Sequence, residues 1–313
     1  MSETTVVTQQ VINGLSLGGM YALLALGFTL VYGIIELINF AHFNVFMIGS
    51  FIGMWVLQAF GLSGQSVLLT GLPLAGALVA ALIVSMFGSG MLGVAIERYT
   101  LRPLRGKTGS AGGTVGMITT IGVSYILFNV ILLGFGADTK NFPDPLPIIQ
   151  FKVEGANLDL RVILIWLVSI VLMVGLWLFV QKSKLGKAMR AVAQDAEAAR
   201  MMGVDVDRAV IMAFFWGSAL AGAAGLIFGL YYNFTSFLIG YTAGLRAFTA
   251  AVLGGIGNIP GAMLGGLIIG LIEALGGQFI AVKWTDVIIF AILVFILVLK
   301  PTGLLGTMAP SKS

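Results

Sequence analysis

The sequence has no cysteine and only one histidine, His42. The absence of cysteine excludes a disulfide framework, a thiol nucleophile and a thiolate metal site. A single histidine leaves no histidine cluster for zinc or haem. The apolar segments hold no cluster of acids either. We therefore expect no catalytic residue, no metal site, no cofactor and no enzyme activity in this chain.

Charge is also scarce. Charged residues make up 10% and hydrophobic residues 58% of the 313 positions, whereas a soluble domain has about 25% charged residues. A soluble protein of this size could not hide so much apolar surface. We therefore predict an all-α polytopic integral membrane protein, a single transmembrane domain over residues 1–313 surrounded by lipid. The net charge of +4 indicates basic cytoplasmic loops and not nucleic-acid binding.

Long apolar runs follow one another along the chain, and a membrane span needs roughly 20 such residues. The first ten residues carry no basic region of the signal-peptide type, so we expect the first run to be a retained span. We predict about nine spanning or broken helices, within a range of about 8–10. They are 11–35, 44–60, 72–96, 115–136, 162–181, 209–232, 236–256, 260–281 and 284–299.

Glycine is abundant, with 43 residues, and often recurs four positions apart. Small residues at that spacing let helix backbones approach closely in lipid. We interpret these glycines as packing faces and not as binding sites. The pairs are Gly14/Gly18, Gly49/Gly53, Gly225/Gly229, Gly261/Gly265 and Gly266/Gly270.

Most of the charges lie in three polar stretches, 97–107, 137–161 and 182–208. The first and third are rich in Lys and Arg, which predicts that both are cytoplasmic and that the middle one is external. Counting the predicted spans from these stretches toward both ends of the chain places the N-terminus outside and Lys300 inside. The external stretch has three prolines in "FPDPLP", which favours an extended chain with a small hairpin. No polar stretch is long enough for an ATPase domain, so we expect energy conversion on another polypeptide.

The stretch 182–208 is too polar to cross the membrane, and its Ala, Met, Lys, Arg and Glu content favours helix. Asp195 is placed to cap a helix over 196–202, and Gly203 is placed to end it. Gly186 and Asp195 thus divide the stretch into two short helices. On its residues alone, the stretch is either an ordinary amphipathic connector or a surface that a partner binds.

The same stretch contains "EAARMMG" at 197–203, with the spacing E-A-A-x-x-x-G. This spacing resembles the EAA loop of ABC-importer permeases, whose short cytoplasmic helices dock into a groove on the ATPase. The Ile-x-Leu-Pro ending of the broader pattern is absent here. The resemblance implies an ATPase-coupling role for Gly186, Arg190, Asp195, Glu197, Ala198, Ala199 and Gly203.

Five ordered segments are similar to the LivH group of branched-chain amino acid permeases, over about residues 11 to 306. They read "GLSLGGMYALLALGFTLVYGI", "INFAH", "GKAMRAVAQDAEAARMMGV", "GLRAFTAAVLGGIGNIPGAMLGGLIIGLIEAL" and "LVLKPTGLLG". There are departures. Phe43 and Asn44 stand where the group usually has small or acidic residues, and Glu36 stands where it more often has a small or apolar one. These differences leave the fold unaffected and the exact substrate open.

The resemblance implies a permease subunit of an ABC importer in a bacterial inner (plasma) membrane. Its implied partners are a second, LivM-type permease, two ABC ATPase subunits that bind the ATP, and a periplasmic or lipoprotein solute-binding protein. The implied substrate is a branched-chain or other hydrophobic amino acid. Urea, short amides and small organic acids are alternatives within the same permease group.

The stretch "ELINFAHFN", residues 36–44, places polar residues between two apolar runs. One interpretation is a cytoplasmic loop, although the stretch has no Lys or Arg. The other is a break in a helix pair beside the solute path, since polar backbone within a bilayer persists only inside protein or beside a water-filled cavity. In that case Asn39, His42 and Asn44 would offer neutral hydrogen-bond partners to a zwitterionic solute or to a neighbouring helix end.

Two ionisable residues lie within predicted spans. Glu273 is far from either end of its span, and an acid there costs roughly 3 kcal/mol or more unless it is paired or protonated. It is either a pathway residue or a structural partner of Arg246. Glycines and Pro260 around Arg246 suggest either a half-helix that begins near Gly244 and points at a substrate carboxylate, or an ordinary kinked span. Asp286 is interpreted as part of an interfacial anchor.

A stand-alone secondary transporter is the other functional class to weigh. Glu273 or Glu36 would then serve as a proton relay. The basic stretch with its E-A-A spacing favours the ATP-driven importer over this alternative.

Overall fold

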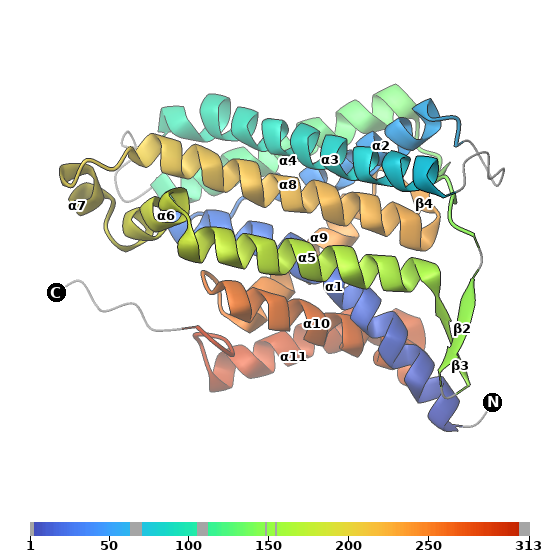
Figure 1. Cartoon of the computed structure of the whole chain (residues 1–313). Helices are drawn as coiled ribbons and strands as arrows, with labels where there is room; N and C mark the ends of the chain where they lie inside the picture. The colour runs from blue at the N-terminus through green and yellow to red at the C-terminus, as the bar shows by residue number, and fades with distance from the viewer. Residues whose placement is uncertain (1–2, 63–70, 105–111, 148, 154, 307–313) are drawn as a thin grey trace.

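The structure is a computed structural model that describes residues 3–62, 71–104, 112–147, 149–153 and 155–306 (Figure 1). These residues form a helical bundle with two small strand pairs at one end. Seven helical stretches are long and apolar enough to cross a membrane. The prediction of an all-α polytopic membrane protein is therefore confirmed.

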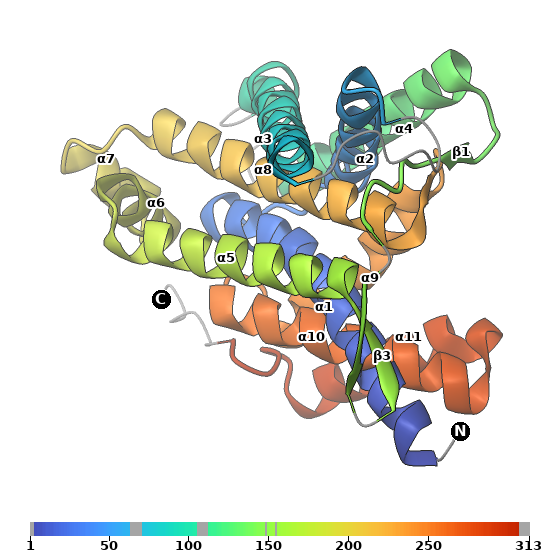
Figure 2. The same ribbon diagram turned by 45° about the vertical axis from the view of Figure 1, so that its right-hand side comes forward.

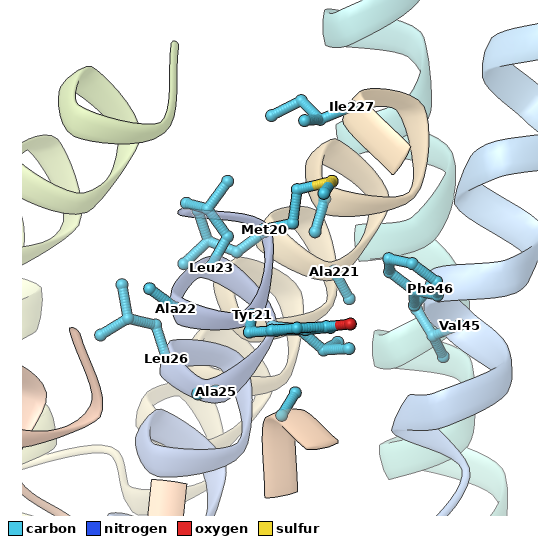
Figure 3. Packing of buried hydrophobic residues seen from close by; sticks show 14 of the residues in the cluster. Met20, Tyr21, Ala22, Leu23, Ala25, Leu26, Val45, Phe46, Ala221 and Ile227 are labelled. Atoms are coloured by element: carbon cyan, nitrogen blue, oxygen red, sulfur yellow. The ribbon is translucent and has the colours of Figure 1, made fainter. Parts of the chain in front are cut away.

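Helix α1 (Glu3–Ile35) runs through the middle of the bundle, and α8 (Val206–Tyr232) packs against it. In both views, α2 (His42–Ala59), α3 (Leu72–Ala95) and α4 (Gly112–Phe135) lie on one side of α8 (Figures 1 and 2). Helix α1 lies on the other side, with α10 (Ile259–Gly276) and α11 (Thr285–Leu299) beyond it. Side chains from α1, α2 and α8 fill the core between them (Figure 3).

Glycines set the closest helix contacts, as their spacing predicts. In α1, Gly14 and Gly18 lie against the backbone of Leu271 and Leu267 in α10. Side chains at these positions would collide with that backbone. The glycine faces therefore let the backbones of α1 and α10 approach closely. The resulting van der Waals contact holds the two helices together in lipid.

The outer helices α3, α4 and α5 (Leu160–Lys182) turn apolar side chains outward. Examples are Ile83, Ile126 and Leu167, each more than half exposed. In water such surfaces would be unfavourable, but in a bilayer they face lipid. The outward apolar faces thus agree with the membrane assignment.

The seven spanning stretches and the nine predicted spans differ at the C-terminal end. Helix α9 (Ile239–Gly254) has only 16 residues, which is too short to count as a span. Helices α10 and α11 count as one stretch, 259–299. A π-helical turn over Gly277–Ala281 and a 3-10 turn over Val282–Trp284 separate them, and the chain turns back there.

The segment after α11 closes this region. Leu304 donates its N–H to the Leu253 carbonyl at 2.8 Å, and Leu305 donates to the Gly254 carbonyl at 3.0 Å. The end of α11 therefore lies beside the end of α9, where α10 also begins. This places α10 and α11 antiparallel. The predicted spans 260–281 and 284–299 are therefore separate helices, although α11, with 15 residues, is shorter than a full span.

The two ends of the bundle differ as the charge pattern predicts. At one end, β1 (Lys140–Asn141) pairs with β4 (Phe234–Thr235), and β2 (Gln150–Val153) forms a hairpin with β3 (Ala156–Asp159) (Figure 1). The N-terminus lies at this end. The hairpin expected in 137–161 is thus present.

The opposite end carries α6 (Lys184–Gln194) and α7 (Ala196–Met201), together with the end of α11. The basic stretch after α3 also lies there, as a π-helical turn over Ile96–Leu101 and a 3-10 turn over Arg102–Leu104. Positions 105–107 of that stretch lie outside the described residues. Both stretches predicted to be cytoplasmic therefore share one end, opposite the stretch predicted to be external.

Candidate functional site

The segment after α1 turns back into the bundle. Helix α1 ends at Ile35, and Glu36 follows with φ 51°. Helix α2 begins at His42, whose side chain packs against Gly27, about eight residues or 12 Å inside the end of α1. Gly27 also touches the carbonyl of Gly217, in the middle of α8. Helix α2 therefore begins at mid-depth, and the polar segment is not a loop at the end of the bundle.

Helix α4 supplies hydrogen bonds to the non-helical backbone of this segment. Thr120 accepts the N–H of Phe40 at 3.2 Å; its hydroxyl oxygen also lies 3.4 Å from the carbonyl of Ile38, while the shorter contact of its O–H, at 2.8 Å, is with the Met117 carbonyl of its own helix. Backbone groups that leave a helix inside the bilayer need such partners, because no water is present to bond them. Thr120 thus lowers the free-energy cost of the non-helical backbone between α1 and α2.

Asn39 forms the turn that starts α2. Its side-chain oxygen accepts the N–H of Ala41 at 3.1 Å, and its carbonyl accepts the N–H of His42 at 3.2 Å. This is the local backbone bonding that favours asparagine in turns. The residue is buried, with 3% of its surface exposed. Its geometry supports a role in shaping the break.

His42 lies in the apolar interior just inside that turn. Its ring meets the ring of Phe28 edge-on, with centroids 4.5 Å apart. Its Nε2 atom is buried and has no hydrogen-bond partner among the described residues. A small cavity beside it, also bordered by Asn39 and Tyr32, has room for about one water molecule. A buried nitrogen next to such a space is suited to binding water or a polar solute group.

Asn44 joins α2 to α4. Its side-chain nitrogen donates to both the carbonyl and the hydroxyl oxygen of Ser124, each at 2.7 Å. Together they border a groove between α2, α4 and α9 whose other walls are largely aromatic. Asn44 thus reaches an open space large enough for a solute.

Arg246 and Glu273 form an ion pair between α9 and α10. Arg246 also bonds Asp286 at the start of α11 at 3.0 Å and the hydroxyl of Tyr21 in α1 at 3.3 Å. One arginine therefore joins four helices, and its charge is balanced by two carboxylates. Of the two alternatives for Glu273, the geometry shows the pairing with Arg246.

The half-helix predicted to start near Gly244 is wrong in its starting point. Helix α9 begins at Ile239, so Gly244 lies inside it. Gly244 is needed there because the ring of Phe43 packs directly against it. Asp286, interpreted as part of an interfacial anchor, also bonds Arg246. A charge partner 40 positions away in the sequence could not be inferred from local pattern.

The five predicted pathway residues fall into two groups. Asn39, His42 and Asn44 lie on the α2 side of α9, where Gly244 meets Phe43. Arg246 is two residues further along α9, which is about 200° around the helix, and it faces α10 and α11. The structure therefore does not bring the charged pair and the polar break into one site.

Glu36 is also separate from Glu273. It follows the last residue of α1 and is exposed, whereas Glu273 lies in the ion pair beyond the opposite face of α9. No observation in the bundle therefore favours a proton relay.

The stretch 182–208 folds into two helices with side-chain caps. Ser183 caps α6 by accepting the N–H of Gly186 at 2.9 Å. Asp195 caps α7 by accepting the N–H groups of Glu197 at 2.9 Å and Ala198 at 3.0 Å. Gly203 follows α7 with φ +83°, the conformation that favours glycine after a helix. Two short helices are present as predicted and Asp195 divides them, but Gly186 lies inside α6, which begins at Lys184, and α7 ends at Met201, one residue earlier than expected.

Other predicted coupling residues attach these helices to the bundle. Arg190 bonds the side chain of Gln181 at 2.8 Å and its carbonyl at 3.1 Å, which ties α6 to the end of α5. Gly186 packs on the last carbonyls of α5, where no side chain would fit. Ala199 is buried. Met201 and Met202, 82% and 85% exposed, are the large apolar side chains on the outward surface of the loop, which also includes the exposed Asp195 and Glu197.

Several of these residues were not singled out in the sequence. Thr120 and Ser124 are four apart in α4, so they lie on one helix face, and this spacing was an available signal. The sequence carries no signal for Tyr21, because a tyrosine within a long apolar run is not unusual. Its side chain extends from α1 toward Val45 and Phe46 of α2 (Figure 3). Met201 and Met202 were part of the E-A-A stretch without a role assigned to them.

Comparison with known proteins gives consistent matches over nearly the whole chain. Residues 10–297 match the family described as branched-chain amino acid transport system / permease component. The chain is 39% identical over 310 residues to the high-affinity branched-chain amino acid transport system permease protein BraD of Pseudomonas aeruginosa, covering 98% of each chain. It is 39% identical over 304 residues to LivH of Escherichia coli K12, covering 95% of each. A probable branched-chain amino acid transport permease protein LivH of Methanocaldococcus jannaschii is 30% identical, with 92% of this chain and 89% of that protein covered.

Proposed function

The chain belongs to the family of branched-chain amino acid transport system permease components, and from this premise we propose that it is the membrane-spanning subunit of an ATP-driven importer of branched-chain or other hydrophobic amino acids. It resides in the bacterial inner (plasma) membrane. It performs no bond chemistry. The observation that carries the proposal is the two-helix cytoplasmic loop at the end of a bundle with seven spanning stretches.

The proposal includes three kinds of partner protein. A second, related permease of the LivM type would complete the passage across the membrane. Two ABC ATPase subunits would bind and hydrolyse the ATP, and a periplasmic or lipoprotein solute-binding protein would deliver the amino acid at the end that carries β2 and β3. ATP binding on the partners would move α6 and α7 and so alternate access to the path between the permeases.

The exposed surface of the loop supports contact with another protein. Met201 and Met202 lie beyond the membrane-spanning helices and are almost fully exposed. Exposed apolar side chains outside the lipid mark interaction sites, and methionine adapts well to a protein groove. Arg190 and Gly186, by contrast, are bonded to or packed on α5. We therefore place the ATPase contact on α7 and the mechanical link to the bundle on α6.

A direct test combines uptake and co-purification. The chain, its companion permease, the two ATPases and the binding protein are reconstituted in liposomes, and ATP-dependent uptake of labelled leucine is measured. We expect uptake that needs all components. Met201→Asp with Met202→Asp should abolish co-purification with the ATPases. A complex that retains the ATPases with both substitutions, or that imports no hydrophobic amino acid, would contradict the proposal.

Met201→Asp with Met202→Asp tests ATPase binding more specifically than charge reversal at Arg190 or Gly203→Asp. Arg190 holds α6 on Gln181, so its reversal would disturb the loop itself. Gly203 has a positive φ, so any side chain there adds strain. Asp at 201 and 202 changes the exposed surface while leaving the Asp195 cap of α7 intact. As a control, Met202→Leu keeps the apolar surface and should keep the ATPases bound.

A further inference from the structure

A groove of about 430 Å³ lies between α2, α4 and α9, within the volume range of about 300–1,000 Å³ that small-molecule sites occupy. It is open on one side. Its walls include Phe40, Phe43, Asn44, Ser124, Tyr125 and Tyr241. The groove lies at the mid-depth break that begins α2, so its contents would sit near the middle of the bilayer.

One wall of the groove is apolar and fixed in position. Phe43 is 5% exposed, and its ring meets those of Phe28 and Phe40 edge-on, with centroids 5.4 and 5.7 Å apart. Edge-on aromatic pairs hold one another in defined orientations. This wall offers a rigid surface to an aliphatic side chain.

The adjoining wall has a polar side chain that can accept a further hydrogen bond. Asn44 gives its side-chain nitrogen to Ser124. Its oxygen lies beside Gly240, in the first turn of α9, and has no hydrogen-bond partner among the described residues. An acceptor with free capacity at the wall of the groove suits a ligand that carries an ammonium group.

Two tyrosines at the open side argue that the groove does not face lipid. Tyr125 and Tyr241 are 66% and 62% exposed, and neither hydroxyl bonds a described residue. Tyr125 lies about 20 Å from the start and 15 Å from the end of α4, counted at 1.5 Å per residue. A hydroxyl turned toward hydrocarbon at that depth is unfavourable. This face therefore borders a polar space or another protein subunit.

We propose that the groove between α2, α4 and α9 is a solute-binding surface that receives an α-amino acid with an aliphatic side chain. Phe40 and Phe43 contact the side chain. The Asn44 oxygen accepts a hydrogen bond from the ammonium, and the tyrosine hydroxyls donate to the carboxylate. The second permease closes the open side. This inference rests on the proposed function and adds to it the residues that contact the solute.

A second groove of similar size has no comparable polar groups. It lies between α3, α5 and α8 and is lined by aliphatic side chains together with Arg161. Arg161 is already bonded to Asp144 at 2.6 Å. Such a surface accommodates lipid chains and offers nothing to hold a zwitterion.

The first test fills the groove from its exposed side. Ile121 lines the groove and is 37% exposed, whereas Ile126 is an exposed isoleucine of the same helix that does not line it. In the reconstituted complex, Ile121→Trp should lower the maximal rate of leucine uptake by about tenfold, with the binding protein saturating. ATP hydrolysis stimulated by the binding protein should persist, because the α6–α7 loop is unchanged. Ile126→Trp should behave like the unmodified complex.

The possible results distinguish failure of the groove assignment from failure of the proposed function. Unchanged leucine uptake with Ile121→Trp overturns the groove assignment and leaves the proposed function standing. Equal losses with Ile121→Trp and Ile126→Trp, or parallel losses of uptake and ATP hydrolysis, also overturn it. An unmodified complex that imports no leucine overturns the proposed function itself.

A second measurement does not depend on any variant. Photo-leucine, a diazirine analogue of leucine, is imported by the complex, irradiated during turnover, and its attachment sites are mapped by mass spectrometry. We expect labelled peptides from 38–45, 120–128 and 238–245, with labelling suppressed by excess leucine. Leucine-sensitive labelling confined to other segments would overturn the proposal.

Discussion

Arg246 of α9 and Glu273 of α10 form an ion pair within the membrane-spanning part of the bundle, with 22% and 14% of their side chains exposed. Asp286 at the start of α11 approaches the same arginine at 2.9 Å and is 62% exposed. The arginine therefore has two carboxylate partners, whereas Glu273 has only this one cation among the described residues. This asymmetry predicts different consequences for the loss of each residue.

Loss of the arginine should be the more damaging change. Arg246→Met leaves the charge of Glu273 buried without a partner, and breaking such a pair costs about 3–5 kcal/mol. Glu273→Gln leaves Arg246 paired with Asp286 and should cost clearly less. Thermal unfolding of the purified permease in detergent measures both. The double variant Arg246→Met with Glu273→Leu should recover most of the loss; a double variant as unstable as Arg246→Met alone would show that the pair is not what stabilises this region.

Asn39 should act through the turn it forms. Asn39→Ala removes the acceptor for the Ala41 N–H, which should cost about 1 kcal/mol of stability and lower transport by displacing His42. Asn39→Ser keeps a side-chain oxygen suited to the same kind of turn and should restore much of both. The comparison uses uptake and melting temperature together. If serine and alanine reduce uptake equally at unchanged stability, the amide itself contacts the solute.

His42→Ala tests the unpartnered nitrogen separately. The ring fills space beside Phe28, so alanine should destabilise the bundle as well as reduce uptake. His42→Phe keeps an aromatic ring of similar size and removes the nitrogen. We expect His42→Phe to fold with near-normal stability and to transport poorly, with the ATPases still bound. Normal uptake by His42→Phe would show that the nitrogen has no role in transport.

The α1–α10 contact should tolerate no side chain. A β-carbon at Gly18 would lie 2.7 Å from the Cα atom of Leu267, and such overpacking costs about 1–3 kcal/mol. Gly18→Ala should therefore lower the melting temperature and the yield of folded protein. Gly76→Ala in α3 and Gly175→Ala in α5 are matched controls, because no atom lies within 4 Å of either added carbon. Both controls should be neutral or slightly stabilising, since alanine favours helix.

Glu36 should be replaceable by glycine with a gain in stability. It follows α1 with φ 51°, a conformation that costs L residues about 1–2 kcal/mol and glycine almost nothing. Glu36→Gly should raise the melting temperature by a corresponding amount. Uptake measured on the same preparation shows whether the carboxylate contributes to transport: lower uptake at higher stability assigns it a role, and unchanged uptake assigns it none.

Parts of the site that depend on local signals could be predicted from the sequence. Asp195 and Gly203 define α7 because a cap and a stop act on residues within a few positions of themselves. The position of the break before α2 was likewise visible as polar residues between apolar runs. Hydropathy placed the spans, since each is a continuous run of about 20 residues.

Contacts between distant segments could not be predicted in this way. Asn44 and Ser124 are 80 positions apart, and Arg246 and Asp286 are 40 apart. Nothing in either local pattern indicates which helix faces which. The division of the pathway residues over two faces of α9 also depends on where that helix starts, and its glycines suggested a start at Gly244 and not at Ile239. Glycine in a membrane helix marks close packing as often as a break, and here Phe43 packs on it.

The pairing of α1 with α10 has a consequence for how the protein is made. Helix α1 is synthesised first, yet the residues that receive Gly14 and Gly18 are Leu271 and Leu267, some of the last to emerge from the ribosome. During translation its small-residue face has only lipid or earlier helices beside it. The native core therefore closes only after the C-terminal helices have inserted, because contacts between distant segments form late. Chains interrupted before residue 259 should accordingly be recognised as incomplete and degraded by membrane quality-control proteases.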